Sequence, residues 1–203
     1  MPNPRLAMVV TALFLATQPA LADPPATAEV AKDKAEVLEH KAAEQQPAPR
    51  SEIITKAEAK AVDPAGENPV DDALTCLSRT IYWEAKGATD ADMAAVANVV
   101  LNRVGHEGFA DTICGVVKDG SQKPPCQFSW WCDGRADQVQ EDAQYSMATE
   151  IARKALNQQL PDGTGGAMYF HDRRVRPAWA GEYVRTAQTG KFMFYKPRAG
   201  KAR

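Results

Sequence analysis

The sequence has few histidines and almost no net charge, and these two shortages exclude several classes of function. Its 203 residues include three histidines and carry a formal net charge of −2. A chain so nearly neutral lacks the basic surface through which proteins bind nucleic acid, so we expect no nucleic-acid partner. The chain has no paired CxxC motifs, and His106 and His171 lack the spacing of zinc ligands. We therefore expect neither a metal ion nor another cofactor.

Long apolar runs are absent as well, except for one at the amino terminus. Arg5 precedes an apolar stretch over residues 6–16, and Ala20-Leu21-Ala22 has the small-x-small pattern of a signal-peptide cleavage site. The apolar stretch is short for a bilayer span. We therefore expect a signal peptide over residues 1–22, cleaved after Ala22, and an exported protein. An uncleaved anchor is the alternative.

Four cysteines are present, and export makes their number informative. Cys76, Cys114, Cys126 and Cys132 form an even set, which in an oxidising compartment indicates two disulfides. Three connectivities are open. We favour Cys126–Cys132, which closes a short loop, together with Cys76–Cys114, which would join the first helix of the domain to a later one.

Residues 23–70 contain no aromatic residue and few large apolar ones. The ranges 28–46 and 51–62 favour helix through their Ala, Glu and Lys content, but they offer little to bury. We expect a disordered or partly helical linker that acts as a flexible tether to a monomeric domain. A segment that folds on contact with a protein partner is the alternative.

Residues 71–197 carry the patterns of one folded domain, followed by a tail over residues 198–203. Helical periodicity, capping residues and glycine stops predict helices near 71–86, 89–104, 111–117 and 138–158. Alternating apolar residues then predict strands over 167–171, 183–187 and 192–195. Helices followed by a small antiparallel sheet indicate the α+β class.

Glu84 is the first candidate for chemistry. It flanks an apolar stripe made by Leu74, Leu77 and Ile81, and it lies one turn before Gly87, a natural helix stop. Partial burial and the negative end of the helix dipole both raise the pKa of such a carboxyl, which a general acid near neutral pH requires. The alternative is a solvated glutamate at a helix edge.

The stretch Cys126–Gly134 is the second candidate. Trp130 and Trp131 lie between cysteines, beside Gln127 and Ser129, and this combination suits sugar rings, whose faces stack and whose hydroxyls form hydrogen bonds. The alternative is a small local core for the loop. Asp133 precedes Gly134 and favours a turn, although it could assist catalysis.

Other polar residues leave two interpretations open. Asn98 and Asn102 lie in an otherwise apolar helix, where they either bridge to neighbouring backbone or point into the site beside Glu84. Arg173, Arg174 and Arg176 form a basic cluster that is either a solvated loop face or a contact for a peptide carboxylate.

Taken together, Ile81–Gly87 and Met93–Val104 resemble the cell-wall hydrolases of the SleB (spore-cortex-lytic) type. Cys114–Val117, Gln127–Trp130 and Gly165–Phe170 extend the resemblance in the same order, so that it covers roughly residues 73–196. The cysteines fit the form of this family found in Gram-negative bacteria, which implies a periplasmic protein.

The resemblance implies a small lysozyme-like, lytic-transglycosylase-like α+β domain that binds peptidoglycan glycan strands. It also implies cleavage of the N-acetylmuramic acid–N-acetylglucosamine bond as a lytic transglycosylase, with Glu84 as the catalytic residue. We expect the substrate-binding side chains to be Tyr82, Asn102, Gln127, Ser129, Trp130, Tyr169 and His171.

Two departures from the family pattern and several rival functions remain. Family members usually have a glutamate where this chain has Ala88, and a histidine where it has Phe192. The rivals are an N-acetylmuramoyl-L-alanine amidase, including a zinc-dependent one, and a cysteine peptidase that uses His171. A catalytically impaired glycan-binding module is a further alternative.

Overall fold

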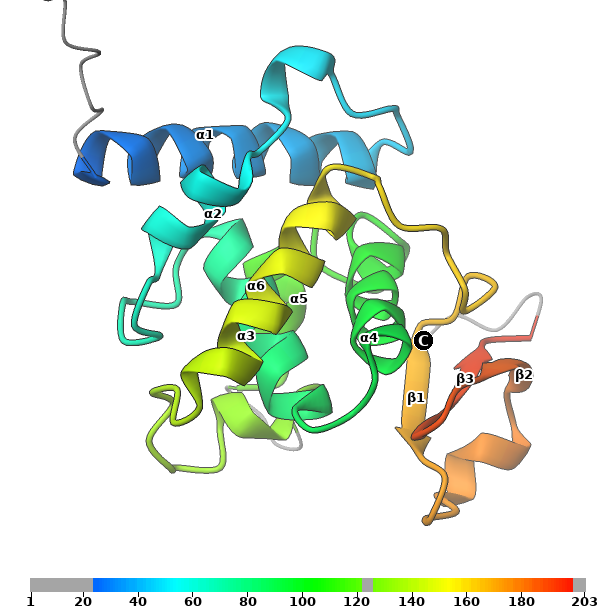
Figure 1. Cartoon of the computed structure of the whole chain (residues 1–203). Coiled ribbons are helices and arrows are strands. Elements are labelled where there is room, and N and C mark those ends of the chain that lie inside the picture. The colour runs from blue at the N-terminus through cyan, green and yellow to red at the C-terminus, as the bar shows by residue number, and fades with distance from the viewer. Residues whose placement is uncertain (1–23, 122–125, 199–203) are drawn as a thin grey trace, which may run out of the picture.

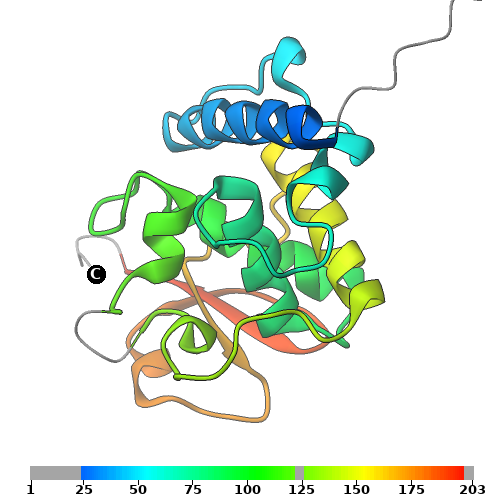
Figure 2. The same ribbon diagram turned by 90° about the vertical axis from the view of Figure 1, so that its left-hand side faces the viewer.

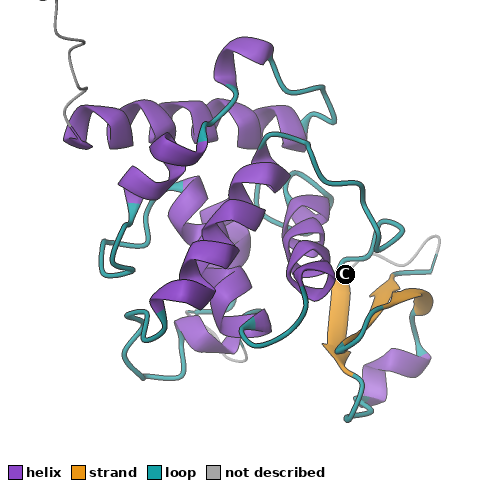
Figure 3. Ribbon diagram, viewed as in Figure 1, coloured by secondary structure: helices purple, strands orange, loops and turns teal. Residues whose placement is uncertain are grey.

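The computed structural model describes residues 24–121 and 126–198. The expected signal peptide lies outside the described residues. Within the described ranges the chain forms six α-helices and one three-stranded sheet (Figures 1 and 3). In the same ranges, no helix combines the length and the apolar character that a membrane span needs.

Helix α3 (Ala73–Ala85) lies at the centre of the domain and contacts all five other helices. Its side chains are buried on almost every side, including Leu74, Leu77 and Ile81. Asp72 caps its first turn by accepting a hydrogen bond from the Thr75 amide at 2.8 Å. Gly87 follows its end with a φ of +74°, a conformation that favours glycine. Glu84 is therefore held in the last turn of the most buried helix.

Helices α4 (Asp90–Arg103), α5 (Ile113–Lys118) and α6 (Asp142–Leu156) pack around α3. The capping box expected at the start of α4 is present, with Thr89 and Asp92 bonding each other's backbone amides. The Asn98 amide group donates to the Pro161 carbonyl at 3.1 Å, so it bridges to neighbouring backbone.

The sheet consists of β1 (Tyr169–Asp172), β2 (Val184–Gln188) and β3 (Phe192–Lys196), in the order β1-β3-β2 and antiparallel throughout. The buried side chains of Phe192 and Phe194 attach it to the core. Asp92, at the start of α4, accepts a hydrogen bond from the Lys191 amide at 2.8 Å and fixes the β2–β3 turn. The predicted α+β class, with helices first and a small antiparallel sheet last, is confirmed.

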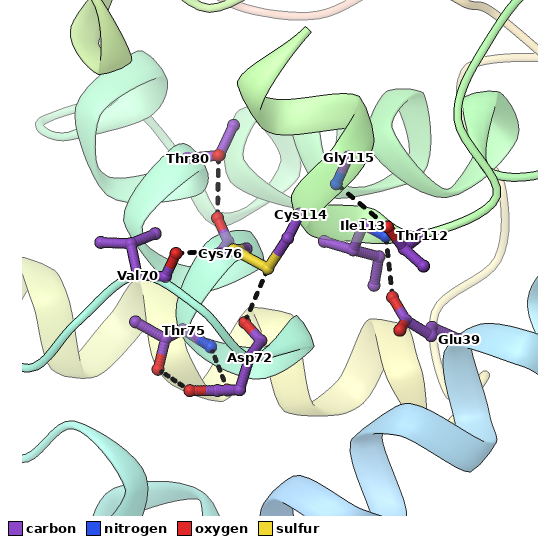
Figure 4. Close-up of a disulfide and its surroundings, with 10 residues drawn as sticks. All are labelled: Glu39, Val70, Asp72, Thr75, Cys76, Thr80, Thr112, Ile113, Cys114 and Gly115. Atoms are coloured by element: carbon purple, nitrogen blue, oxygen red, sulfur yellow. Dashed lines mark hydrogen bonds between the residues drawn. A yellow bond between two sulfur atoms is a disulfide. The ribbon is translucent and has the colours of Figure 1, made fainter.

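Both disulfides pair the cysteines as expected. Cys76–Cys114 joins α3 to α5 across 38 residues, and Figure 4 shows it beside the Asp72 cap. Cys126–Cys132 closes the tryptophan-containing loop across six residues. The first bond constrains the unfolded chain more strongly because it closes the longer loop.

Residues 24–70 differ from the expectation of a flexible tether. Helix α1 (Pro24–Ala43) and helix α2 (Lys56–Val62) pack together and against the domain, and Figures 1 and 2 place α1 at the end of the helical bundle opposite the sheet. Ala31, Ala35 and Leu38, spaced at one helical face, are fully buried. A stripe of mostly alanine buries little area per residue, but it lets two helices approach closely.

Polar contacts reinforce this docking. The Glu39 carboxylate accepts a hydrogen bond from the Ile113 amide at 2.7 Å, at the start of α5. Asp63, after α2, forms an ion pair with the buried Arg79 of α3 at 2.8 Å and accepts a bond from the Tyr145 hydroxyl at 2.6 Å. Since buried charges persist only when paired, these contacts tie the amino-terminal helices to the same core as α3.

Replacing Leu38 with alanine tests this docking. We expect Leu38→Ala to lower the free energy of unfolding by about 2–4 kcal/mol, because it removes a fully buried side chain. Val37→Ala is the matched control, since Val37 lies on the exposed side of the same helix. Denaturant unfolding measures both variants, and equal stabilities would show that α1 does not belong to the core.

Candidate functional site

Two adjoining cavities meet at Glu84. The larger has a volume of about 640 Å³ and the smaller about 430 Å³, and Glu84 and Ser129 lie in the walls of both. The carboxyl group therefore stands between two hollows that continue each other across the surface. An elongated ligand lying in both would pass over Glu84.

The larger cavity is walled by the sheet, the segment before β2 and the end of α4. Five aromatic rings contribute to its lining, and polar groups are interspersed among them. Besides Glu84, the side chains relevant to ligand binding are Arg103, Gln127, Ser129, Tyr169, Phe170, His171, Trp179, Tyr183, Lys191 and Phe192. Flat rings interleaved with hydrogen-bonding groups form a surface suited to carbohydrate.

The smaller cavity is walled by the end of α3 and the disulfide-closed loop. Trp83 and Trp130 supply its aromatic surface, and Asp133, Asp137 and Gln140 supply polar groups. The Trp83 indole N–H donates to the Asp137 carbonyl at 3.4 Å, so α3 and the segment around residue 137 support each other.

The electrostatic setting of Glu84 suits a proton donor. Burial raises the pKa of its carboxyl to about 7, and the positive charges of Lys191 and Arg103 offset part of that effect. The Lys191 ammonium donates to the Glu84 backbone carbonyl at 2.9 Å, not to its carboxyl group. Over residues 24–121 and 126–198, we find no hydrogen bond or ion pair to the Glu84 carboxyl group, so it remains available to a ligand.

Arg103 is a site residue that the sequence patterns did not single out. It is buried in the last turn of α4, donates to the Met168 carbonyl at 2.7 Å and lies over the rings of Phe109, Phe128 and Tyr169. An arginine at the end of a largely apolar helix was the available signal, because a charge placed there needs polar partners if it is buried.

The two adjoining cavities together are called the groove. Five of the expected substrate-binding residues line it together with Glu84. Four of them, Gln127, Ser129, Tyr169 and His171, line the larger cavity, and Trp130 lines the smaller one. The His171 ring stacks on the Tyr195 ring, with centroids 5.3 Å apart, and its Nε2 lies 3.0 Å from the Tyr195 hydroxyl. These contacts fix the histidine in the wall.

Tyr82 and Asn102, expected to bind substrate, are not among the residues that line these two cavities. Tyr82 is fully buried, bonds Glu141 through its hydroxyl and accepts the Gln140 amide at 3.1 Å. Asn102 donates to the Ala167 carbonyl at 3.0 Å. Both side chains therefore hold segments that lead into the walls, and Asn102 takes the backbone-bridging role left open above.

Carboxyl groups other than Glu84 also lie in the walls of the two cavities, and the sequence patterns had pointed only to Asp133 among them. Asp137 shares the smaller cavity, and burial first and the nearby Asp133 second raise its pKa. Asp133 accepts the Arg135 amide at 2.9 Å and thus forms the expected turn. In the larger cavity, hydrogen bonds from Arg174 hold the pKa of Asp172 well below its usual range.

Two features bear on the rival chemistries. All four cysteines are disulfide-bonded, so none offers a thiol nucleophile. In the described part of the chain, no three His, Cys, Asp or Glu side chains come together as a metal site would require.

Phe192, one of the two departures, lies in the wall of the larger cavity. Its ring meets that of Phe170 edge to face at a centroid distance of 5.1 Å, and the Lys191 ammonium lies 4.9 Å from it. The side chain at this position of the wall is therefore apolar.

The raised pKa of Glu84 predicts a pH-dependent stability difference. Between pH 4.5 and about 7 the folded state binds more protons than the unfolded state, so the free energy of unfolding falls as pH rises through this window. Glu84→Gln has no titrating carboxyl at this position, so its free energy of unfolding lacks this decrease with pH. Relative to wild type, we expect the free energy of unfolding of Glu84→Gln to increase by up to about 3 kcal/mol between pH 4 and 8, since one pKa unit is worth about 1.4 kcal/mol. Denaturant titrations measure it, with Glu107→Gln, an exposed glutamate, as control. A difference that does not change with pH would contradict the raised pKa.

Comparison with known proteins agrees with this architecture. The chain is 30% identical over 135 residues to the spore cortex-lytic enzyme of Halalkalibacterium halodurans, an alignment that covers 64% of this chain and 36% of that protein. It is 28% identical to the Bacillus cereus spore cortex-lytic enzyme over 126 residues, which covers 61% and 44% of the two chains. The chain thus spans less than half the length of these curated relatives.

A solved structure is similar as well. The catalytic domain of the Bacillus cereus SleB protein superposes with a TM-score of 0.50 at 26% identity, covering 61% of this chain and 89% of that domain.

The sequence model of the cell wall hydrolase family matches residues 87–195, and this match begins three residues after Glu84. The family match therefore does not include Glu84, and any catalytic role of this residue has to be inferred from the geometry of the site. Because the match extends over more than half of the chain, the protein belongs to the cell wall hydrolase family.

Proposed function

We propose that this protein cleaves the glycan backbone of peptidoglycan at the N-acetylmuramic acid–N-acetylglucosamine bond, as a lytic transglycosylase that uses Glu84. One observation carries the proposal. The Glu84 carboxyl group, with a pKa of about 7 and no hydrogen bond or ion pair to any of residues 24–121 and 126–198, lies where two ring-lined cavities meet. The spore cortex-lytic relatives and the similar SleB catalytic domain support the choice of substrate.

The mechanism requires one group that acts first as acid and then as base. Protonated Glu84 gives its proton to the glycosidic oxygen, whose bond to C1 of the muramic acid breaks and leaves its electron pair on that oxygen. The 6-hydroxyl of the same sugar then attacks C1 and returns its proton to the Glu84 carboxylate. The product is a 1,6-anhydro sugar, and no water is consumed. A pKa near neutrality suits both steps.

The groove walls supply binding on both sides of this centre. Trp179, Tyr183 and Tyr169 offer ring faces in the larger cavity, and Trp83 and Trp130 offer them in the smaller one. Lys191 and Arg103 bring positive charge toward Glu84 and stabilise its carboxylate after the proton has been donated.

Hydrolysis is the second candidate, and Asp137 favours it. This carboxyl shares the smaller cavity with Glu84, and burial raises its pKa. An inverting hydrolase would use it as a base that activates water, which requires a carboxyl separation of roughly 6.5–9.5 Å. Such an enzyme would yield reducing sugars.

We also propose that the chain is exported to the periplasm after cleavage following Ala22, where it acts as a monomer on glycan strands. Two disulfides support an oxidising compartment.

Product analysis tests the proposal. We expect the mature protein to release 1,6-anhydro-muropeptides from purified sacculi, and Glu84→Gln to reduce this release by about 10²–10⁴-fold, because it removes the acid and base. Mass spectrometry of the products measures both. Circular dichroism verifies the fold of the variant, and Glu107→Gln is the control with an unrelated exposed glutamate.

The same products separate the alternatives. Reducing sugars that disappear in Asp137→Asn would establish hydrolysis, and freed stem peptides would indicate an amidase. Undiminished anhydro products from Glu84→Gln would reject the assignment of Glu84.

A further inference from the structure

A third cavity, of about 800 Å³, opens beside the groove and is rich in positive charge. Its wall contains four basic residues, Lys86, Arg173, Arg174 and Lys191, against two acidic ones, Asp92 and Asp172. Lys86 pairs with Glu141 at 3.2 Å and Arg174 with Asp172 at 2.8 Å, so Arg173 and Lys191 supply the charge that a ligand can use. It shares Asp172, Arg174 and Lys191 with the larger cavity of the groove. The basic cavity therefore borders the groove at these three residues, close to a sugar that would lie at Glu84.

The two acidic residues of the basic cavity are already engaged. Asp92 accepts hydrogen bonds from the Thr89 hydroxyl at 2.7 Å and the Lys191 amide at 2.8 Å. Asp172 accepts two bonds from the Arg174 guanidinium, at 2.9 and 2.8 Å. Both carboxylates are thus used to hold the start of α4, the β2–β3 turn and Arg174, which follows β1.

Basic groups with donors to spare remain in the wall. The exposed Arg173 donates one hydrogen bond through Nη1, to the Gly190 carbonyl at 3.1 Å, which leaves other guanidinium N–H groups for a ligand. The Lys191 ammonium uses one donor on the Glu84 carbonyl. Guanidinium groups bind carboxylates through paired hydrogen bonds, so the cavity is suited to a carboxylate-bearing ligand.

The chemistry of peptidoglycan supplies such a ligand close to the reacting atom. The stem peptide is joined through a lactyl ether to C3 of muramic acid, the same ring whose C1 reacts. This peptide carries free carboxylates, the first on its glutamate residue. When that ring lies at Glu84, the peptide must leave the groove nearby.

We propose that the basic cavity binds the free carboxylates of the stem peptide, so that the enzyme prefers peptide-bearing glycan over bare glycan. This inference rests on the proposed function, since it uses the position of the muramic acid ring at Glu84. It assigns Arg173 and Lys191 to substrate recognition, a role that the glycan chemistry alone does not need.

Ala88 provides the test because it lies in the wall of the basic cavity. Ala88→Glu places an opposing charge there, and Ala88→Gln adds a neutral side chain of the same size. The readout is the ratio of kcat/KM on peptide-bearing glycan to that on glycan strands whose peptides an amidase has removed. We expect Ala88→Glu to lower this ratio about fivefold, the size of one added charge facing a carboxylate near the surface, and Ala88→Gln to keep it.

A binding measurement does not depend on cleavage. The free tripeptide L-alanyl-D-glutamyl-diaminopimelate is titrated into the mature protein and followed by amide NMR shifts. We expect saturable shifts at Ala88, Arg173 and Lys191 that weaken in Ala88→Glu and persist in Ala88→Gln.

The outcomes distinguish this inference from the proposed function. A wild-type enzyme that cleaves both glycans with equal kcat/KM, and whose ratio does not change in Ala88→Glu, would overturn the inference and leave the glycan cleavage intact. Cleavage of neither glycan would reject the proposed function. The tripeptide titration would then test separately whether the basic cavity binds the stem peptide. Absence of tripeptide-induced shifts in the wild type would overturn the proposal that the basic cavity binds the stem peptide.

Discussion

The burial of one carboxyl group at the end of a central helix is the constraint on which the site depends. Glu84 lies in the last turn of α3, and every other helix packs on that helix. Desolvation there raises the pKa of the group toward neutrality, while Lys191 and Arg103 limit the rise. A fully exposed glutamate would stay ionised at neutral pH, and one paired with a cation would be held as a carboxylate. The arrangement avoids both, because Lys191 bonds the backbone carbonyl of the residue.

The amino-terminal helices contribute to this constraint from a distance. Asp63 holds the buried guanidinium of Arg79 in α3, and Arg79 in turn donates to the Asp137 carbonyl. Trp83 donates to that same carbonyl. The segment around residue 137 forms a wall of the smaller cavity, so the ion pair between Asp63, which precedes the expected catalytic domain, and Arg79 positions part of the groove. Residues 24–70 are therefore a structural part of the folded unit.

The sequence alone predicted the features that local chemistry determines. The capping box at Thr89, the glycine stop after α3 and the order of helices and strands follow from the chain's own patterns, and the structure confirms them. The favoured cysteine pairing is confirmed too. Local patterns did not reveal how α1 docks, because its buried face is mostly alanine and its partners lie far along the chain. Asp137 and Arg103 were missed because their partners also lie far along the chain. Tyr82 was assigned to the groove, although its side chain is fully buried.

The direct measurement of the central claim is the pKa of the Glu84 side chain itself. Carbon-13 NMR of protein labelled at the glutamate carboxyl carbons, titrated from pH 3 to 9, reports it, and the spectrum of Glu84→Gln identifies the signal. The account predicts one resonance that titrates with a pKa of about 7. A Glu84 resonance that titrates near 4.5, the ordinary value for glutamate, would contradict it.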